Sequence, residues 1–505
     1  MNERVDLLII GGGINGAGVA RDAAGRGLSV LLAERHDYAG ATSSSSSKLI
    51  HGGLRYLENL EFGLVREALG EREVMLRIAP HLTRPLRFLV PIEQHPPRPL
   101  WMVRLGLQFY DLLAGRRRLE GSGRLRDDEV DRIPHFRGNR YRAVLYYTDV
   151  LTDDARLVLE TLLDARQRGA DVRNYCEATS IVAVKDGYRV TLGHGGYSRH
   201  VLTRYLVNAA GPWANCVHGR IDRSGPGRDL RLVRGSHIVL RMPQPPITDA
   251  MTLQRSDGRV VFLLPWLTRF LVVGTTEVPQ DNPDQRAVCT TEERDYLLAA
   301  ANDAVEMHAQ PDSVVWSWSG VRPLVDDKSD RISKTSRGSL LDVTANGRSG
   351  CITIYGGKIT TYRRLAERVM DALAGLGASI GPAWTADAPL HGGGLARDAL
   401  SRLAERASNV PPDIIRRWAF TYGDVTQDLV ECIAKDPRLG AEIVPGVPLA
   451  ELDHAWAVED ARTAADFLER RTKLRLILDE KAQQRVEHWF TQRANPRNRR
   501  ACVHG

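Results

Sequence analysis

Three glycines near the N-terminus have the spacing of a loop that binds the phosphates of a dinucleotide. Gly11, Gly13 and Gly16 form the pattern GxGxxG. In such a loop the first glycine permits a tight turn, the second lets the backbone approach a pyrophosphate, and the third lets a helix pack closely on a sheet. The N–H groups and the partial positive charge at the start of that helix favour phosphate. A glycine turn without a ligand is the alternative interpretation.

The elements that must position this loop are present in the sequence around it. Residues 5–10 form a short apolar run that predicts a buried strand, residues 17–26 have helical spacing, and residues 29–33 form a second apolar run. Together they make a strand–helix–strand unit of about 30 residues. Glu34 ends the second run, where a carboxylate accepts hydrogen bonds from ribose hydroxyls. The unit fits NAD as well as FAD, so it leaves the cofactor open.

Three later segments favour FAD. Thr42 and the five serines at residues 43–47 supply small hydroxyl donors directly after the unit, with a flexible solvated loop as the alternative. Residues 208–213 end a strand in small residues, as is needed where backbone closes over a nucleotide. Residues 355–362 predict a strand, a glycine turn and a helix start. A helix N-terminus at that point would stabilise the negative charge of a reduced flavin.

The length of 505 residues predicts more than one domain. Helical spacing recurs at residues 60–78 and 101–115, and many short apolar runs in the middle of the chain predict strands. Beyond a glycine-rich linker at residues 390–394 the pattern is helical to the end. We therefore expect a separate C-terminal helical domain, in which residues 467–473 form either an interface or a solvated helix face.

Composition excludes several classes of protein. Lys plus Arg is 69 and Asp plus Glu is 62, and a net charge of +7 over so long a chain falls short of a nucleic-acid-binding protein. The six cysteines are scattered without metal-ligand spacing, which indicates free thiols, a reduced compartment and no metal site. No apolar run approaches the roughly 20 residues of a membrane-spanning helix, and the charged N-terminus differs from a signal peptide. We expect a soluble or peripherally attached cytoplasmic protein.

Over nearly its whole length the sequence resembles the FAD-dependent glycerol-3-phosphate dehydrogenases of the respiratory type. The segments that carry the resemblance are residues 9–18 (IIGGGINGAG), 46–57 (SSKLIHGGLRYL), 235–237 (GSH), 274–277 (GTTE), 318–324 (WSGVRPL), 356–363 (GGKITTYR) and 470–473 (RRTK). The parts at residues 51–57 and 319–324 are much more specific than GxGxxG.

The resemblance implies an α/β and α+β fold with three domains. A Rossmann-like FAD-binding domain of the glutathione-reductase and amine-oxidase type would be discontinuous. It would take residues 1–80, 145–230 and 315–388, a sheet-based substrate cap residues 81–144 and 231–314, and the helical domain residues 389–505. The implied reaction oxidises sn-glycerol 3-phosphate to dihydroxyacetone phosphate, with hydride passing from C2 to flavin N5 and electrons to membrane quinone. The implied protein is a homodimer, peripheral on the inner face of the cytoplasmic membrane.

The resemblance also implies which residues form the site. The cofactor contacts are Gly11, Gly13, Ile14, Asn15, Gly16, Glu34, Thr42, Ser43, Ser47, Lys48, Leu49, His51, Ala178, Ala210, Gly211, Trp213, Gly357, Lys358, Ile359 and Thr360. The catalytic group is His51, Arg55, Tyr56, Arg322, Arg337 and Lys358, and the substrate would be bound by Arg55, Arg322 and Arg337. A phosphate dianion needs fixed cations, and the planar fork of arginine binds phosphate oxygens in pairs. The alternative for each arginine is a surface salt bridge.

Three of these residues have roles suggested by their chemistry. His51 is the candidate general base because the pKa of histidine lies near neutrality, and a purely structural histidine is the alternative. Tyr56 is a hydroxyl partner or a packing residue. Lys358 polarises the alcohol or stabilises reduced flavin, or is a solvated lysine.

Residues 101–113 predict an amphipathic helix with an unusually narrow polar stripe. The stripe is Arg104, Gln108 and Asp111, and Arg116, Arg117 and Arg118 follow the helix. Such a helix with a basic flank can lie on an acidic bilayer. A helix buried in the cap domain is the alternative.

Other functions remain open at this stage. An oxidase of the same fold would pass electrons to oxygen, and an amine or amino-acid oxidase would use the arginines for a carboxylate. A flavin-binding membrane scaffold without activity is the alternative outside the enzymes.

Overall fold

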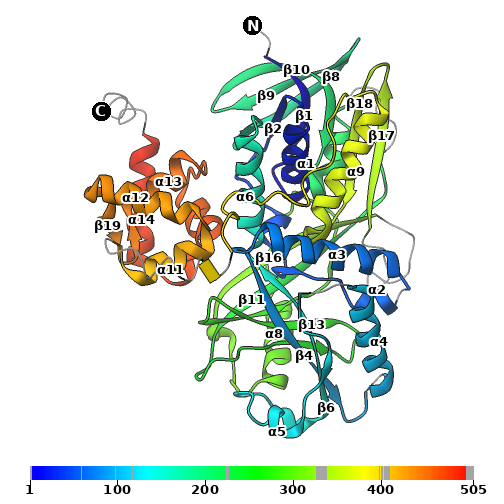
Figure 1. The fold of residues 1–505 in the computed structure, drawn as a ribbon, viewed down its shortest axis with the longest axis vertical. Coiled ribbons are helices and arrows are strands. Elements are labelled where there is room, and N and C mark those ends of the chain that lie inside the picture. Colours follow the sequence, from blue (N-terminus) through cyan, green and yellow to red (C-terminus); the bar gives the residue numbers. More distant parts are fainter. Residues whose placement is uncertain are drawn as a thin grey trace.

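The computed structural model describes residues 3–58, 60–96, 98–115, 118–221, 227–325, 338–396, 398–399, 402 and 410–495. Figure 1 shows three parts: a sheet with helices at the top, a second sheet below it, and a helical body at one side. The chain passes from the first sheet into the second and back more than once, so each sheet is built from segments distant in sequence.

The first sheet contains the predicted strand–helix–strand unit, and its main strand order is β17-β18-β10-β1-β2-β7. The bounds are β1 (Glu3–Ile10), β2 (Val30–Ala33), β7 (Asp171–Arg173), β8 (Glu177–Val184), β9 (Gly187–His194), β10 (Tyr197–Asn208), β17 (Ser339–Asn346) and β18 (Ser349–Gly356). β1 pairs in parallel with β2 and β10, and β10 pairs in parallel with β18. The carboxyl ends of these strands therefore meet at one edge.

Three helices cover one face of this sheet: α1 (Ile14–Gly25), α6 (Asp154–Gln167) and α9 (Tyr362–Gly375). Leu7 and Ile9 of β1 share a core with them, whereas Leu8 and Ile10 pack among β8 and β9 on the other face. This alternation follows from the two-residue period of a strand. Both faces of β1 are covered, which explains why its sequence is a continuous apolar run.

The second sheet is mostly antiparallel, with main order β15-β11-β14-β13-β12-β4-β6-β3 and β16 paired to β11. The bounds are β3 (Leu49–Ile50), β4 (Thr83–Glu93), β5 (Gly123–Arg124), β6 (Tyr141–Thr152), β11 (Leu230–Arg241), β12 (Ala250–Gln254), β13 (Val260–Trp266), β14 (Phe270–Gly274), β15 (Val278–Gln280) and β16 (Val314–Val325). One face packs on α8 (Thr291–Ala304) and the other on α3 (Phe62–Ile78) and α4 (Leu100–Leu113). The short helices are α2 (Arg55–Glu58), α5 (Asp127–Val130) and α7 (Ala214–His218).

The C-terminal body is helical, as predicted, apart from one short hairpin. Its elements are α11 (Pro412–Thr421), α12 (Val425–Lys435), β19 (Glu442–Val444), β20 (Val447–Pro448), α13 (Leu449–Ala457), a π-helical turn at Asp466–Arg471 and α14 (Glu480–Ala494). Two apolar clusters of its own hold it together, one of them around the fully buried Trp418. Within the described part of the chain, no helix is both long enough and apolar enough to cross a bilayer.

Candidate functional site

Two cavities adjoin where the carboxyl ends of the first sheet meet the second sheet. One has a volume of about 690 Å³ and is lined by the glycine loop after β1, and the other has a volume of about 820 Å³ and reaches α4. Ile14, Ser43 and Gly357 line both cavities, so the two spaces share a wall. We call them the nucleotide cavity and the reaction cavity.

The glycine loop has the close packing that its spacing predicts. Gly11 has a φ of +113°, and a Cβ atom there would lie 2.6 Å from the carbonyl oxygen of Ala209. A Cβ atom at Gly16 would lie 1.9 Å from the carbonyl oxygen of Gly11. A side chain at Gly16 would therefore push α1 off the loop, and α1 would no longer direct its N-terminus at the nucleotide cavity.

Glu34 lies at the end of β2, at the edge of the nucleotide cavity. Its two carboxylate oxygens accept hydrogen bonds from the backbone N–H groups of Gly12 (2.7 Å) and His36 (2.8 Å). Across the same cavity, the Trp213 ring lies 4.4 Å from the guanidinium carbon of Arg35, and its indole N–H donates to Asp284 at 2.7 Å. Ala178, Ala210 and Gly211 are further lining residues.

The serine run is a hydrogen-bonded turn, and the solvated-loop alternative is wrong. Thr42 and Ser43 lie in a 3-10 turn at Thr42–Ser44. The Thr42 hydroxyl donates to the carbonyl of Val321 at 2.6 Å, and the Ser43 hydroxyl accepts from the N–H of Ile14 at 3.0 Å. The run therefore links the start of α1 to β16, which belongs to the other sheet.

Ser47 meets a buried histidine for which we had predicted no role. The Ser47 hydroxyl lies 2.9 Å from Nε2 of His237, and the imidazole stacks on Trp318 with 5.3 Å between ring centres. Burial, together with the charges of Arg322 and Lys48, lowers the pKa of His237 well below its usual value. His237 belongs to the GSH segment at residues 235–237, one of the segments that carry the family resemblance. That segment was the one signal in the sequence that could have pointed to His237.

Lys48 lines neither cavity, unlike the other predicted cofactor contacts at residues 42–51. Its ammonium is 2.7 Å from the Asp154 carboxylate and 4.6 Å from the centre of the Trp318 ring. A buried ammonium needs such a partner, and Asp154 supplies it outside the cavities. Lys48 thus supports the serine run from behind and does not line the cofactor space.

The reaction cavity brings together most of the predicted catalytic residues. His51, Tyr56, Arg322 and Lys358 all line it, as do Leu49, Ile359 and Thr360. The Lys358 ammonium lies 3.6 Å from the centre of the Tyr56 ring. The Arg322 guanidinium donates to the Thr275 hydroxyl at 3.2 Å, and the backbone N–H of His51 donates to the Thr360 hydroxyl at 3.3 Å.

The structure gives less information on the other two predicted arginines, Arg55 and Arg337. Arg55 is the first residue of α2, directly before Tyr56. Arg337 lies outside the described residues. Arg98 lines the reaction cavity although no sequence pattern singled it out. It lies in the proline-rich stretch just before α4, where no periodicity indicates which way a side chain points.

The residues at the shared wall fit a flavin dinucleotide. Asn15 Oδ1 is buried and has no hydrogen-bond partner among the described residues, while the amide nitrogen of Asn15 donates to the carbonyl of Gly356 at 3.0 Å. A Cβ atom at Gly357, where φ is +99°, would lie 2.7 Å from that nitrogen. The wall therefore keeps backbone and an unpaired acceptor at the junction of the two cavities. Such a junction suits a flat ring whose edge carries an N–H donor.

Comparison with known proteins identifies the family. The model of the FAD-dependent oxidoreductases matches residues 6–363, and that of the C-terminal domain of alpha-glycerophosphate oxidase matches residues 383–494. A glycerol-3-phosphate dehydrogenase from Pseudomonas aeruginosa is 41% identical, over 97% of this chain and 95% of its own. A D-erythritol 1-phosphate dehydrogenase from Brucella abortus is 40% identical, over 97% and 98%. A solved glycerol-3-phosphate dehydrogenase from Bacillus halodurans, complexed with FAD, has a TM-score of 0.77 and 30% identity, over 97% of this chain and 91% of that one.

The fold and the two cavities define a flavoprotein oxidoreductase. The chain belongs to the family of FAD-dependent oxidoreductases, and its cofactor is FAD. The predicted fold class and the resemblance to FAD-dependent glycerol-3-phosphate dehydrogenases are confirmed. The alternative of a protein without enzymatic activity is thereby wrong.

Proposed function

We propose that this enzyme oxidises sn-glycerol 3-phosphate to dihydroxyacetone phosphate. The observation that carries the proposal is that Arg322, Lys358 and His51 line one cavity beside the glycine turn at Gly356 and Gly357. A guanidinium suits a phosphate dianion, an ammonium suits the hydroxyl oxygen at C2, and a histidine suits removal of the hydroxyl proton. The relatives named glycerol-3-phosphate dehydrogenase support this choice of substrate.

In this proposal the phosphate is held by Arg322, with Arg55 and Arg337 as further ligands. Thr275 accepts one N–H of the Arg322 fork and orients it. A preoriented fork loses little freedom when it binds two phosphate oxygens. Lys358, whose ammonium rests on the Tyr56 ring, is the cation we assign to the substrate oxygen at C2.

We assign the proton of the substrate hydroxyl to His51. Its ring has an edge contact with Phe262, with 6.4 Å between ring centres, and it lines the reaction cavity. FAD, when bound, would supply the acceptor for the hydride from C2. His237 is a poorer base, because burial disfavours its protonated form and its Nε2 already has Ser47 as a partner.

A longer polyol phosphate is the second candidate substrate. Thr252, Gln254 and Glu277 line the same cavity and offer polar groups for further hydroxyls. The relative named D-erythritol 1-phosphate dehydrogenase is nearly as similar as the first glycerol-3-phosphate dehydrogenase.

We further propose that the enzyme attaches to the inner face of the cytoplasmic membrane through α4 and passes electrons to quinone. Only Leu107 and Tyr110 of α4 are buried, so the buried-helix alternative is wrong. Trp101, Leu105 and Leu112 are 65%, 56% and 72% exposed. Arg118 supplies a described part of the basic flank, whereas Arg116 and Arg117 lie outside the described residues.

The reaction cavity supports quinone as the acceptor because it extends to the same helix. Met102, Val103, Gly106 and Leu107 of α4 line it. An apolar acceptor dissolved in a bilayer beneath α4 would therefore meet an apolar wall of the cavity. We also keep the domain boundaries given above as part of this proposal. We propose a homodimer as well, and light scattering after gel filtration tests that state.

Anaerobic bleaching of the flavin tests the main proposal. Glycerol 3-phosphate added without air should remove the absorbance of oxidised flavin within one turnover, whereas glycerol should leave it unchanged. Bleaching by erythritol 1-phosphate but not by glycerol 3-phosphate would favour the second candidate, and bleaching by an amino acid would contradict both. Peroxide formation in air, with no reduction of a soluble quinone, would contradict the proposed acceptor.

A further inference from the structure

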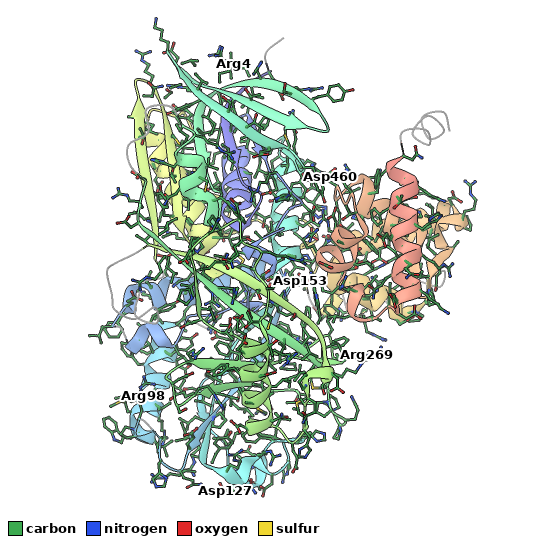
Figure 2. The ribbon with its side chains drawn as sticks, turned by 180° about the vertical axis from the view of Figure 1, so that it is seen from behind. Arg4, Arg98, Asp127, Asp153, Arg269 and Asp460 are labelled. Carbon is green, nitrogen blue, oxygen red and sulfur yellow. The ribbon has the colours of Figure 1, made fainter. Side chains whose placement is uncertain are left out.

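The segment at residues 467–473 of the C-terminal body is an interface and not a solvated helix face. We call Arg470, Arg471 and Lys473 the clamp residues. Arg471 and Lys473 are 1% and 2% exposed, and all three clamp residues pair with carboxylates of the FAD-binding part. Figure 2 labels Asp153, one of these carboxylates, where the C-terminal body approaches the rest of the molecule.

The first contact of the clamp holds the loop that follows β2. Arg471 and Arg470 both donate to the Asp37 carboxylate, with distances of 2.8 Å and 2.6 Å. Although burial acts in the opposite direction, these two guanidinium groups hold the pKa of Asp37 below its usual value. Tyr38, the next residue, packs so closely on the glycine loop that a Cβ atom at Gly12 would lie 3.2 Å from its ring. The clamp therefore fixes the outer wall of the nucleotide cavity.

The second contact reaches the serine run. The Lys473 ammonium lies 2.5 Å from Asp153, which caps the N-terminus of α6. The adjacent Asp154 accepts hydrogen bonds from the N–H (3.1 Å) and hydroxyl (2.7 Å) of Ser46 and from the Lys48 ammonium. Ser47 lies between those two residues and lines the reaction cavity. Two neighbouring carboxylates thus connect Lys473 to the loop that carries Ser47.

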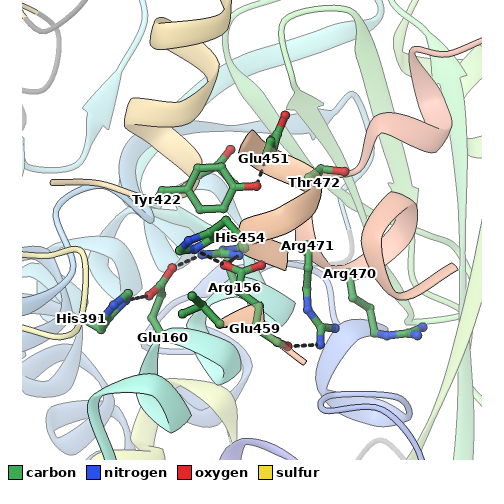
Figure 3. Close-up of polar contacts among 12 residues, drawn as sticks. Arg156, Glu160, His391, Tyr422, Glu451, His454, Glu459, Arg470, Arg471 and Thr472 are labelled. Atoms are coloured by element: carbon green, nitrogen blue, oxygen red, sulfur yellow. Dashed lines mark hydrogen bonds and ion pairs between the residues drawn. The ribbon is translucent and has the colours of Figure 1, made fainter. Parts of the chain in front are cut away.

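A network of buried polar contacts joins α6 to the C-terminal body, and Figure 3 shows its members Arg156, Glu160 and Glu459. Arg156 of α6 bridges Glu160 on its own helix and Glu459 of the C-terminal body. Arg471 also donates to the backbone carbonyl of Glu459 at 2.7 Å. Separating a buried ion pair leaves a charge without a partner, which costs free energy. The charged residues on the two sides are therefore held in the pairs seen here. These ion pairs accordingly fix the position of the C-terminal body on α6.

We propose that Lys473 and Arg471 are positioning residues through which the C-terminal body sets the affinity of the enzyme for FAD. Arg471 acts through Asp37 on the nucleotide cavity, and Lys473 acts through Asp153 and Asp154 on the serine run. Neither residue lines the nucleotide cavity or the reaction cavity, so neither is a catalytic residue. The inference rests on FAD occupying both cavities but is independent of the substrate.

FAD binding by the apoprotein tests this proposal without any substrate. Flavin fluorescence titration of the Lys473→Met variant should give a Kd for FAD raised about tenfold. The matched control is Arg417→Met, because Arg417 pairs with the buried carboxylate of Glu451 within the C-terminal body. This control should lower the thermal midpoint of the body while it leaves the Kd for FAD within about twofold.

A double-mutant cycle separates positioning from general destabilisation. Asp153→Asn should raise the Kd as Lys473→Met does, and the double variant should bind FAD no more weakly than either single variant. If Lys473→Met does not fold, Lys473→Arg retains the cation and should show a smaller change. Wild-type FAD affinity in folded Lys473→Met, or equal weakening by Arg417→Met, would overturn the proposal. Either result would leave the proposed substrate untouched.

Discussion

The ammonium of Lys358 lies 3.6 Å from the centre of the Tyr56 ring in the reaction cavity. An aromatic face attracts a cation, and the attraction grows when water is excluded. Tyr56 comes from α2 and Lys358 from the turn after β18, so the contact joins segments about 300 residues apart in sequence. It fixes a flexible lysine side chain in the reaction cavity.

Replacing Tyr56 separates the contribution of its ring from that of its hydroxyl. Tyr56→Phe keeps the aromatic face and should leave the KM for glycerol 3-phosphate within about threefold, whereas Tyr56→Leu should raise it by about tenfold. Steady-state kinetics with a dye acceptor measures both. A large effect of Tyr56→Phe would assign the role to the hydroxyl instead.

Arg322→Ala should raise the KM for glycerol 3-phosphate by about 10- to 100-fold, because a charge-assisted pair to the phosphate is lost. The flavin spectrum should stay that of the bound cofactor. Arg241→Ala, at an exposed position of β11, is the control and should behave as wild type. A normal KM for Arg322→Ala would show that the phosphate binds elsewhere.

His51→Ala should slow the reduction of the flavin by about 10²- to 10⁴-fold, the usual contribution of a general base. Anaerobic stopped-flow absorbance gives this rate directly. Ser47→Ala, which removes the partner of His237 and leaves His51 in place, should have a much smaller effect. Equal rates for wild type and His51→Ala would remove His51 from the role of base.

Stability should fall in weak acid because of His81. Both ring nitrogens lack a hydrogen-bond partner among the described residues, and burial lowers the pKa of His81 to about 4. Between that pKa and the ordinary value of 6.5 the unfolded chain binds more protons than the folded one, so acidification favours unfolding. From pH 7 to pH 5 the loss is about 2 kcal/mol.

Urea unfolding at pH 7 and pH 5, followed by tryptophan fluorescence, measures this loss. His81→Leu should remove most of the difference. His391 serves for comparison, because pairing with Glu160 raises its pKa although burial opposes this. The stabilisation from His391 is fully present below pH 6.5 and is lost only as pH rises through the raised pKa. His391 therefore contributes little to the change in the free energy of unfolding between pH 6.5 and pH 5. An unchanged acid loss in His81→Leu would assign the effect to other groups.

Binding to acidic liposomes should depend on the exposed face of α4. Trp101→Glu combined with Leu105→Glu puts two charges on that face and should abolish flotation with vesicles that contain anionic lipid. Tyr197→Glu changes an even more exposed aromatic residue on β10 and should float as wild type does. Wild-type protein that stays at the bottom of the gradient would contradict membrane attachment.

Local patterns in the sequence predicted several of the helices and strands that surround the two cavities. The strand–helix–strand unit and the helices at residues 62–78 and 100–113 follow from apolar periodicity and glycine spacing, which depend on near neighbours. The pairs Ser47–His237 and Lys48–Asp154 join residues 190 and 106 positions apart, and no periodicity reports such contacts. The same holds for Asp37, whose two arginine partners lie more than 430 residues away.

Along α4, Met102 and Gly106 line the reaction cavity, while Trp101 and Leu105 face outward. Met102 is itself 44% exposed. The partition between the cavity and the surroundings is therefore a single helix here. Gly106 adds no side chain to this helix, and a Cβ atom there would meet nothing within 4 Å, so the wall is thinnest at this residue. A bilayer covering α4 would begin within about 10 Å of the cavity, which is roughly one helix diameter. The distance an electron must travel to leave the protein would then be set by the width of one helix.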